Sequence, residues 1–252
     1  MIISLIRQGL SFVEIIKYLI ILLPIILISL VVHEVMHGFV SYKLGDPTAM
    51  NYGRLSLNPL KHLDPFGALS MLLFGFGWAK PVPINSGYYK NTRLGITLTA
   101  LAGPVSNFLM AFIAVPLMIL LAYAKVTLSL GGAEQSAYLG IVAYSVFGGT
   151  IEAGFLTKLA SVAFIFLQYF ASINIMLGVF NLIPIPPLDG SRVLLVFLPQ
   201  KAYYFVIRYE MYIKIALLLL LVTGLLDGPL NFLENGIFNG FVGLWNLVLG
   251  HG

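Results

Sequence analysis

The sequence predicts an all-α polytopic membrane protein with about four to six transmembrane helices. Of the 252 residues, 59% are hydrophobic and only 10% are charged, whereas about a quarter of the residues in a soluble domain carry a charge. The mean hydropathy is +0.96. Because so few charges cannot cover a water-soluble globule of this size, we expect the chain to lie in a lipid bilayer.

The charge balance and the lack of cysteine exclude several classes of function. The formal net charge is +4, and the basic residues are scattered between apolar runs. Such scattering is typical of topology signals rather than of a nucleic-acid-binding patch, so no nucleic acid partner is expected. The chain has no cysteine, which excludes disulfides, a thiol nucleophile and thiolate metal ligands.

The first predicted membrane helix lies between Lys17 and Lys43, which bracket 25 residues with Glu34 as the only charge. A helix of that length rises about 37 Å, enough to span a bilayer with some tilt. Pro24 predicts a kink or an internal turn. Residues 1–16 are expected to form either an interfacial amphipathic helix or an extension of this span.

A polar segment and a short apolar segment follow. Residues 43–65 contain Gly, Pro and Asn at frequent intervals, which is typical of a loop. Residues 66–78 are apolar, but they are too few to cross a membrane, so a re-entrant or interfacial segment is expected.

The later part of the chain contains three further apolar stretches that predict membrane spans, at residues 94–124, 155–182 and 203–226. The sequence leaves open whether residues 138–149 also cross. The tail, residues 229–250, carries Gly every few residues and is expected to lie in the membrane interface.

The distribution of Lys and Arg predicts the orientation. Residues 43–93 carry six of these residues, whereas only Lys125 follows close to the far end of the second span. Cytoplasmic loops are rich in Lys and Arg, so residues 43–93 are expected in the cytoplasm. No segment between the spans is long enough for a soluble module, so residues 1–252 are expected to form a single domain.

The motif His33-Glu34-Val-Met-His37 is the central chemical signal. Positions i and i+4 of a helix lie on one face about 6 Å apart, so the two imidazoles could bind one Zn²⁺. Glu34 stands beside the first ligand and could take a proton from a metal-bound water. Two histidines that satisfy each other in a helix bundle would show the same spacing. Ionisable residues are costly inside a membrane span and rare unless functional, which favours the metal interpretation.

A catalytic zinc site needs a third protein ligand, and Asp189 is one candidate. Three prolines precede it and Gly190 follows it. Broken backbone of this kind is tolerated at membrane depth only where it is buried in protein or lines a cavity, which suits an acid directed at a metal. The spacing is equally compatible with a Pro-rich turn in which Asp189 caps a helix over residues 191–198.

Two asparagines in the predicted spans have two interpretations each. Asn107, four residues after Gly103, is a buried amide that needs hydrogen-bond partners. The same two interpretations apply to Asn181. Either side chain could join two helices, or it could hold a substrate backbone or stabilise an oxyanion.

Taken together, these motifs resemble the site-2 protease family of intramembrane zinc metalloproteases, in its short bacterial form without PDZ or CBS domains. The resemblance covers about residues 31–195, which is the family-like core. Its motifs, in order, are His33–His37, Gly45-Asp-Pro-Thr-Ala49, Gly53-Arg-Leu-Ser-Leu-Asn-Pro-Leu60, His62-Leu-Asp-Pro65, Phe76-Gly-Trp-Ala-Lys-Pro-Val-Pro83, Ala102-Gly-Pro104 with Asn107, and Phe180-Asn-Leu-Ile-Pro184 to Asp189-Gly190.

The resemblance implies that His33, His37 and Asp189 hold one zinc ion and that Glu34 is the general base. It also implies that Asn181 helps to position the substrate, and that residues 52–85 form a membrane-associated β-hairpin or re-entrant element. The implied activity is endoproteolysis of transmembrane or membrane-anchored proteins near the cytoplasmic leaflet, as in regulated intramembrane proteolysis, in a bacterial inner membrane.

A metal-ion transporter or channel is the alternative function, because the same residues could form a transit site. Many transporter folds contain two related halves, and the sequence shows no internal repeat. The sequence does not identify the substrate, the cleavage site or the oligomeric state.

Overall fold

The computed structural model describes residues 6, 9, 11–74, 77–129 and 155–250, and within these ranges it contains helices and no strand. The predicted all-α class is confirmed. Residues 138–149 lie outside the described residues. The helices are α2 (Phe12–Lys43), α3 (Thr48–Asn51), α4 (Pro65–Phe74), α5 (Thr92–Ser129), α7 (Phe155–Leu182), α8 (Asp189–Phe197), α9 (Gln200–Arg208), α10 (Glu210–Val222) and α11 (Asp227–Leu249), with short 3₁₀ turns at Pro59–Lys61 and Ser86–Tyr88.

The first helix, α2, begins at a capping box. The Ser11 hydroxyl accepts a hydrogen bond from the Glu14 amide, and the Glu14 carboxylate accepts one from the Ser11 amide at 2.7 Å. This pair satisfies two amides that a helix start leaves free. Residues 12–16 therefore extend the first span, and the helix continues through Pro24.

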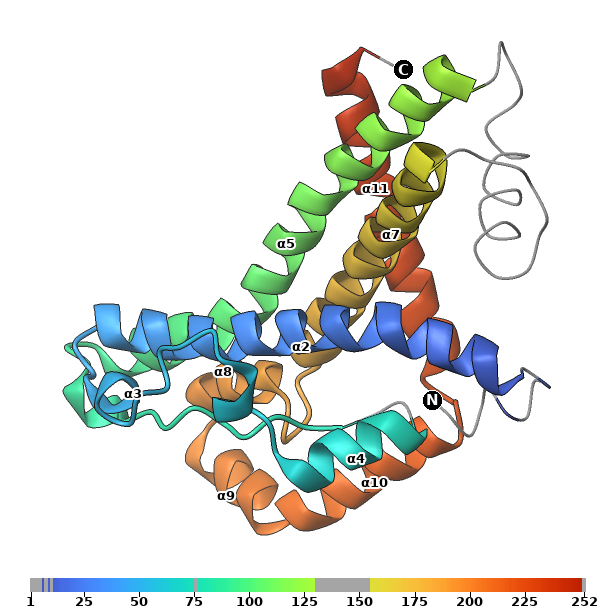
Figure 1. The fold of residues 1–252 in the computed structure, drawn as a ribbon. Helices are drawn as coiled ribbons and strands as arrows, with labels where there is room; N and C mark the ends of the chain where they lie inside the picture. Colours follow the sequence, from blue (N-terminus) through green and yellow to red (C-terminus); the bar gives the residue numbers. More distant parts are fainter. Residues whose placement is uncertain (1–5, 7–8, 10, 75–76, 130–154, 251–252) are drawn as a thin grey trace.

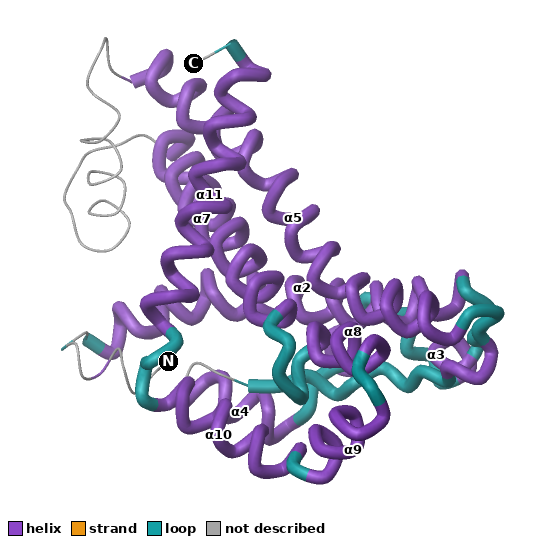
Figure 2. The backbone as a smooth tube through the Cα atoms, turned by 180° about the vertical axis from the view of Figure 1, so that it is seen from behind, coloured by secondary structure: helices purple, strands orange, loops and turns teal. Residues whose placement is uncertain are grey.

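Among the described residues, three helices are long and apolar enough to cross a membrane: Phe12–Lys43, Thr92–Ala122 and Leu159–Leu182. They match the first three predicted spans. In Figures 1 and 2, α5, α7 and α11 run side by side away from α2, while α4, α8, α9 and α10 lie on the other side of α2.

The predicted boundaries of the fourth span, 203–226, are wrong. Helix α10 has 13 residues, which is about 20 Å and too short to cross. The chain bends at Gly224, whose φ is +71°, and α10 and α11 make an angle of 77°. A hydropathy window cannot detect this break, because the residues on both sides of it are apolar.

The tail, which is expected at the membrane interface, is a continuous helix. It forms α11, which packs against α7 and α5, and the Trp245 indole nitrogen donates to the Phe112 carbonyl oxygen of α5 at 3.0 Å. Together with α10, α11 forms the bent pair that counts as a fourth candidate span.

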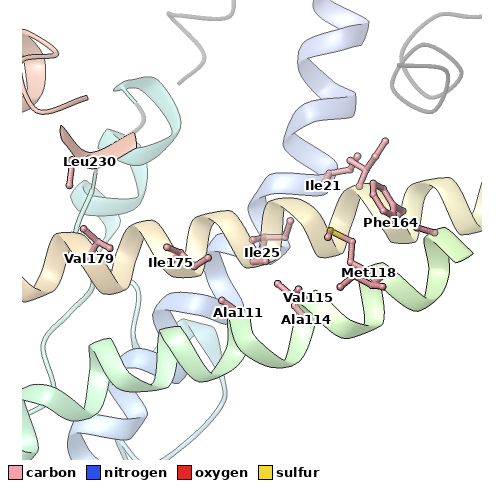
Figure 3. Close-up of a cluster of buried hydrophobic side chains, with 14 residues drawn as sticks. Ile21, Ile25, Ala111, Ala114, Val115, Met118, Phe164, Ile175, Val179 and Leu230 are labelled. Atoms are coloured by element: carbon pink, nitrogen blue, oxygen red, sulfur yellow. The ribbon is translucent and has the colours of Figure 1, made fainter. Parts of the chain in front are cut away.

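The apolar core lies where α2, α5 and α7 meet (Figure 3). Ile25 of α2, Val115 of α5 and Ile175 of α7 are all fully buried there. This packing fixes the crossing of the three helices, and the polar residues of the site lie close along the same crossing.

In the segment between α2 and α5, the residues just before α4 and those after it lie side by side. Leu63 and Ala79 form an isolated antiparallel bridge, and the Lys80 amide donates to the His62 carbonyl at 2.7 Å. Helix α4 lies between these two points. Of the two forms predicted for residues 52–85, the described residues show a helical excursion closed by one bridge rather than a β-hairpin.

Candidate metal centre

Helix α2 places both histidines of the motif on its buried face. Only 5% of His33 and 7% of His37 is exposed. Their rings are nearly perpendicular, at 85°, with centroids 4.7 Å apart, and their Nε2 atoms lie 3.1 Å from each other. The i, i+4 spacing therefore brings one nitrogen of each ring to a common point.

Asp189 reaches the same point from the break after α7. Its Oδ2 atom lies 3.1 Å from the Nε2 atoms of both His33 and His37. Helix α8 has Leu188 at its N-cap position and no side-chain capping bond, so the Asp189 side chain faces the histidines instead of serving as the cap. Gly190 permits this turn, because a Cβ atom there would lie 2.2 Å from the Leu182 carbonyl oxygen.

The outer nitrogen of each imidazole has an acceptor. His37 Nδ1 lies 2.7 Å from the carbonyl oxygen of Thr99, and His33 Nδ1 lies 2.6 Å from Asn107 Oδ1. A carbonyl oxygen only accepts hydrogen bonds, so each Nδ1 carries the hydrogen. In the neutral rings both Nε2 lone pairs then point at the common site.

The donor set fits a zinc ion. The ligand atoms of His33, His37 and Asp189 lie within 4.8 Å of one another. With both rings in this tautomer, three electron pairs face one another without a hydrogen between them, an arrangement that a central cation converts from repulsion into coordination. Two imidazoles and one carboxylate on buried elements are a familiar donor set for catalytic Zn²⁺.

Helix α5 closes one side of the centre at Gly103. A Cβ atom at this position would lie 2.4 Å from His37 Nε2 and 2.6 Å from His33 Nε2. Only a residue without a side chain lets the α5 backbone pass this close to both imidazoles.

Glu34 follows His33 directly on α2, and one of its oxygens is held by the loop. Glu34 Oε2 accepts a hydrogen bond from the Val82 amide at 3.2 Å. Pro81 and Pro83 have no N–H group, so Val82 is the only amide donor among residues 81–83. The carboxylate is thereby oriented by the loop between α4 and α5.

The two candidate asparagines differ in position. Asn107 is fully buried, and its amide group donates to Asn174 Oδ1 at 2.8 Å while its oxygen faces His33. Asn181 lies near the end of α7, where its amide donates to the Leu177 carbonyl at 3.0 Å. The structure therefore brings Asn107 to the metal centre, but it does not bring Asn181 into contact with the three ligand groups.

Thr99, Val82 and Asn174 were not singled out from the sequence. The first two contribute main-chain atoms, which leave no signal in residue type. Asn174 did leave one, since it is an amide in a long apolar run and such groups need a partner.

The fold and this centre describe an integral membrane protein with a buried two-histidine, one-carboxylate site. The chain belongs to Peptidase family M50, which matches residues 21–221. It is similar to the Bacillus subtilis protein "Putative zinc metalloprotease YwhC", with 38% identity over 208 residues, which is 81% of this chain and 83% of YwhC. It is also similar to Rip2 of Mycolicibacterium smegmatis, which carries the same description, with 31% identity over 90 residues, 34% of each chain. No solved structure matches.

These findings make the chain a zinc metalloprotease of the membrane. The resemblance read from the motifs is confirmed, and membership of a peptidase family favours a protease over the metal-ion transporter.

Proposed function

We propose that this protease cleaves transmembrane or membrane-anchored proteins near the cytoplasmic leaflet, as an endopeptidase of regulated intramembrane proteolysis. In this proposal His33, His37 and Asp189 hold one zinc ion, and Glu34 is the general base. The observation that carries the proposal is the convergence of two buried histidines and the half-buried Asp189 in a chain with helices long and apolar enough to cross a membrane.

The chemistry divides between the ion and the chain. Zinc, when bound, supplies an acidic water and polarises the scissile carbonyl. Glu34 takes the proton from the water and returns it to the leaving amine. The Val82 amide holds Oε2 of Glu34, which fixes the carboxylate that would carry this proton.

The position of the site along α2 supports cleavage at the cytoplasmic side. His33 and His37 lie in the half of α2 that ends at Lys43, and the basic segment of residues 43–93 follows. Asp189 comes after the end of α7 nearest to the same region. By the Lys and Arg rule this is the cytoplasmic face, which in a bacterium is the inner side of the cell membrane.

The environment of the site supports an extended substrate. A helical substrate has its backbone hydrogen bonds satisfied and must unwind before attack. The segment around Val82 has no regular secondary structure and lies beside Glu34, and an unwound strand could pair with its main-chain carbonyl groups. We infer that Asn181 assists in positioning that strand.

A pocket of about 210 Å³ lies beside Thr99, and none of His33, Glu34, His37 and Asp189 lines it. It is lined by residues of the loop before α5, by the first turns of α5 and by α8, and it includes Thr99, whose carbonyl group binds His37. We infer that it accepts a side chain of the substrate near the scissile bond.

The decisive experiment compares Glu34→Gln with wild type. We expect purified Glu34→Gln protein to keep its zinc and to lose about 10²- to 10⁴-fold in cleavage rate, because the general base is removed and the ligands are not. Zinc is measured by metal analysis, and cleavage is measured on a transmembrane substrate in liposomes. Comparative proteomics of membrane fractions then shows which proteins accumulate uncut in cells with this variant.

Glu210→Gln is the matched control. Glu210 lies on α10, partly exposed and paired with Lys214 at 2.7 Å, so its substitution should leave cleavage unchanged. Wild-type cleavage by zinc-loaded Glu34→Gln protein would contradict the proposed mechanism.

A further inference from the structure

We propose that Asn174, which contacts neither histidine, is a positioning residue that sets the tautomer of His33 through Asn107. The proposal rests on the proposed zinc centre. It assigns to α7, which supplies no metal ligand, the role of turning the His33 Nε2 lone pair toward the metal.

Four polar side chains form a series of hydrogen bonds that connects α7 to α2 through α5. Asn174 Nδ2 donates to the Phe170 carbonyl oxygen at 2.8 Å and to Ser29 Oγ at 2.9 Å. Asn107 Nδ2 donates to Asn174 Oδ1 at 2.8 Å, and Asn107 Oδ1 lies 2.6 Å from His33 Nδ1. Ser29, Asn107 and Asn174 are each fully buried, so water cannot replace a missing partner.

The donor-to-acceptor direction of these hydrogen bonds is fixed at Asn174, on α7. The Phe170 carbonyl can only accept, so it holds the NH₂ group of Asn174 and leaves Oδ1 of Asn174 facing Asn107. Ser29 imposes the same orientation, because its hydroxyl hydrogen is used on the Ile25 carbonyl at 2.8 Å and its oxygen is left to accept.

The same reasoning carries through to the imidazole. An acceptor on Asn174 requires the NH₂ group of Asn107 to face it, and Asn107 Oδ1 then faces His33. The hydrogen of the neutral ring must therefore sit on Nδ1, and Nε2 carries the lone pair that a metal needs. If Asn107 rotated by half a turn, its NH₂ group would face Nδ1 and the ring hydrogen would move to Nε2, which blocks coordination.

His37 is held differently, and this difference isolates the role of Asn174. The acceptor for His37 Nδ1 is the main-chain oxygen of Thr99, which cannot rotate independently of the helix. The acceptor for His33 is a side-chain amide, whose two ends are almost the same shape. Asn107 needs a partner that distinguishes its ends, and Asn174 is that partner.

Asn174→Leu tests the proposal, because Leu has similar size and no polar atom. We expect zinc affinity, measured by chelator competition on the apo protein in detergent, to fall about 10- to 100-fold, as for other partners of ligating histidines. Asn174→Asp should restore affinity to within about threefold of wild type. A neutral carboxyl group at this position donates its hydrogen toward the Phe170 carbonyl oxygen or Ser29 Oγ, and its other oxygen still accepts from Asn107.

Ile175→Ala is the matched control for packing. Ile175 is the next residue of α7 and is fully buried in the apolar core. Its truncation should lower the melting temperature of the apo protein at least as much as Asn174→Leu, and it should leave zinc affinity within about threefold of wild type. If both variants lose zinc in proportion to melting temperature, or if Asn174→Leu keeps wild-type affinity, the positioning role is overturned.

Nitrogen-15 spectroscopy tests the inference on the wild-type protein as well as on the variant. The chain has four histidines, so nitrogen-15 spectra of the apo protein resolve their ring tautomers. We expect His33 to carry its hydrogen on Nδ1 in wild type and to show a mixture in Asn174→Leu. A wild-type His33 with its hydrogen on Nε2 would overturn the inference.

His33→Ala separates failure of this inference from failure of the proposed function. If His33→Ala binds zinc as tightly as wild type, the proposed centre is wrong and this inference fails with it. If His33→Ala loses zinc while Asn174→Leu does not, the zinc centre stands and only the role of Asn174 is wrong.

Discussion

Gly103 lies against both imidazoles of the centre and has no side chain to contribute. Its position on α5 makes the helix backbone one wall of the proposed zinc site. The site is therefore sensitive to a single added carbon atom at this position.

Gly103→Ala should weaken zinc binding and lower activity together. The added Cβ atom would lie 2.4 Å from His37 Nε2, so the ring or the helix must move. Overpacking costs about 1–3 kcal/mol, which corresponds to roughly 5- to 150-fold in zinc affinity. Chelator competition measures this loss.

Gly236→Ala is the control for Gly103→Ala. It is also a helical glycine, but no atom lies within 4 Å of its Cβ position. Its substitution should leave zinc binding unchanged and should stabilise α11 slightly. Equal zinc affinity in both variants would show that Gly103 does not define the site.

At the residue scale, the sequence predicts the candidate ligands better than it predicts the groups that form hydrogen bonds to the site residues. The spacing of His33 and His37 places them on one helix face, because helix geometry is local. The role of Asp189 needed the fold, since 152 residues separate it from His37 and a turn with a cap was equally compatible with its neighbours. The roles of Thr99 and Val82 depend on main-chain atoms, which residue types do not reveal.

The loop between α2 and α5 holds Glu34. Asp46 stabilises this loop through hydrogen bonds. The fully buried carboxylate of Asp46 accepts hydrogen bonds from the Ser41 hydroxyl at 2.8 Å, from the Thr48 amide at 2.9 Å and from the Asn85 amide at 2.7 Å. Burial alone would raise the pKa of Asp46, but these bonds outweigh it and hold the pKa below its usual value of 3.8.

Asp46→Asn should loosen this loop in a pH-dependent manner. A lowered pKa in the folded protein means that the carboxylate stabilises the fold above its ordinary pKa and that this stability is lost as the pH falls through the lowered value. Hydrogen bonds to a charged group contribute about 1.5–3 kcal/mol. We expect the melting temperature of Asp46→Asn to lie below that of wild type at pH 7 and the difference to shrink below about pH 4.

Asp227→Asn controls for the loss of a charge. Asp227 is exposed at the start of α11, so its substitution should change the melting temperature by less than Asp46→Asn does. A difference between wild type and Asp46→Asn that stays constant down to pH 3 would contradict the role assigned to the carboxylate.

At the element scale, length and hydropathy predict continuous helices and miss bends. The spans over α2, α5 and α7 were predicted because each is one long apolar helix. The fourth was misplaced because apolar residues continue across the bend at Gly224, and only the packing of α11 against α5 and α7 shows which part lies in the bundle.

The whole molecule has an orientation that labelling can test. The chain contains no cysteine, so single-cysteine variants react at one place only. Tyr52, 73% exposed in the loop after α2, should be labelled as Tyr52→Cys by an impermeant maleimide only from the cytoplasmic side. Val248 is 64% exposed in the last turn of α11, and the C-terminal end of α11 lies near the end of α5 (Figure 1). Val248→Cys should be labelled only from outside.

Reversed labelling of both positions would place the site at the outer leaflet, and labelling of both from one side would contradict a membrane-spanning α11.

The class of fold and the family were predictable from composition and motif order. The path of residues 200–250 was not, because it depends on contacts with helices that are distant in the sequence.

The three ligands enter the chain at widely separated times during synthesis. A ribosome has made both histidines by residue 37, but the carboxylate follows 152 residues after the second of them. A growing polypeptide therefore carries an incomplete pair of nitrogen donors while the intervening helices are inserted. In the proposed zinc centre, loading with metal, and the activity that depends on it, therefore follow synthesis of Asp189.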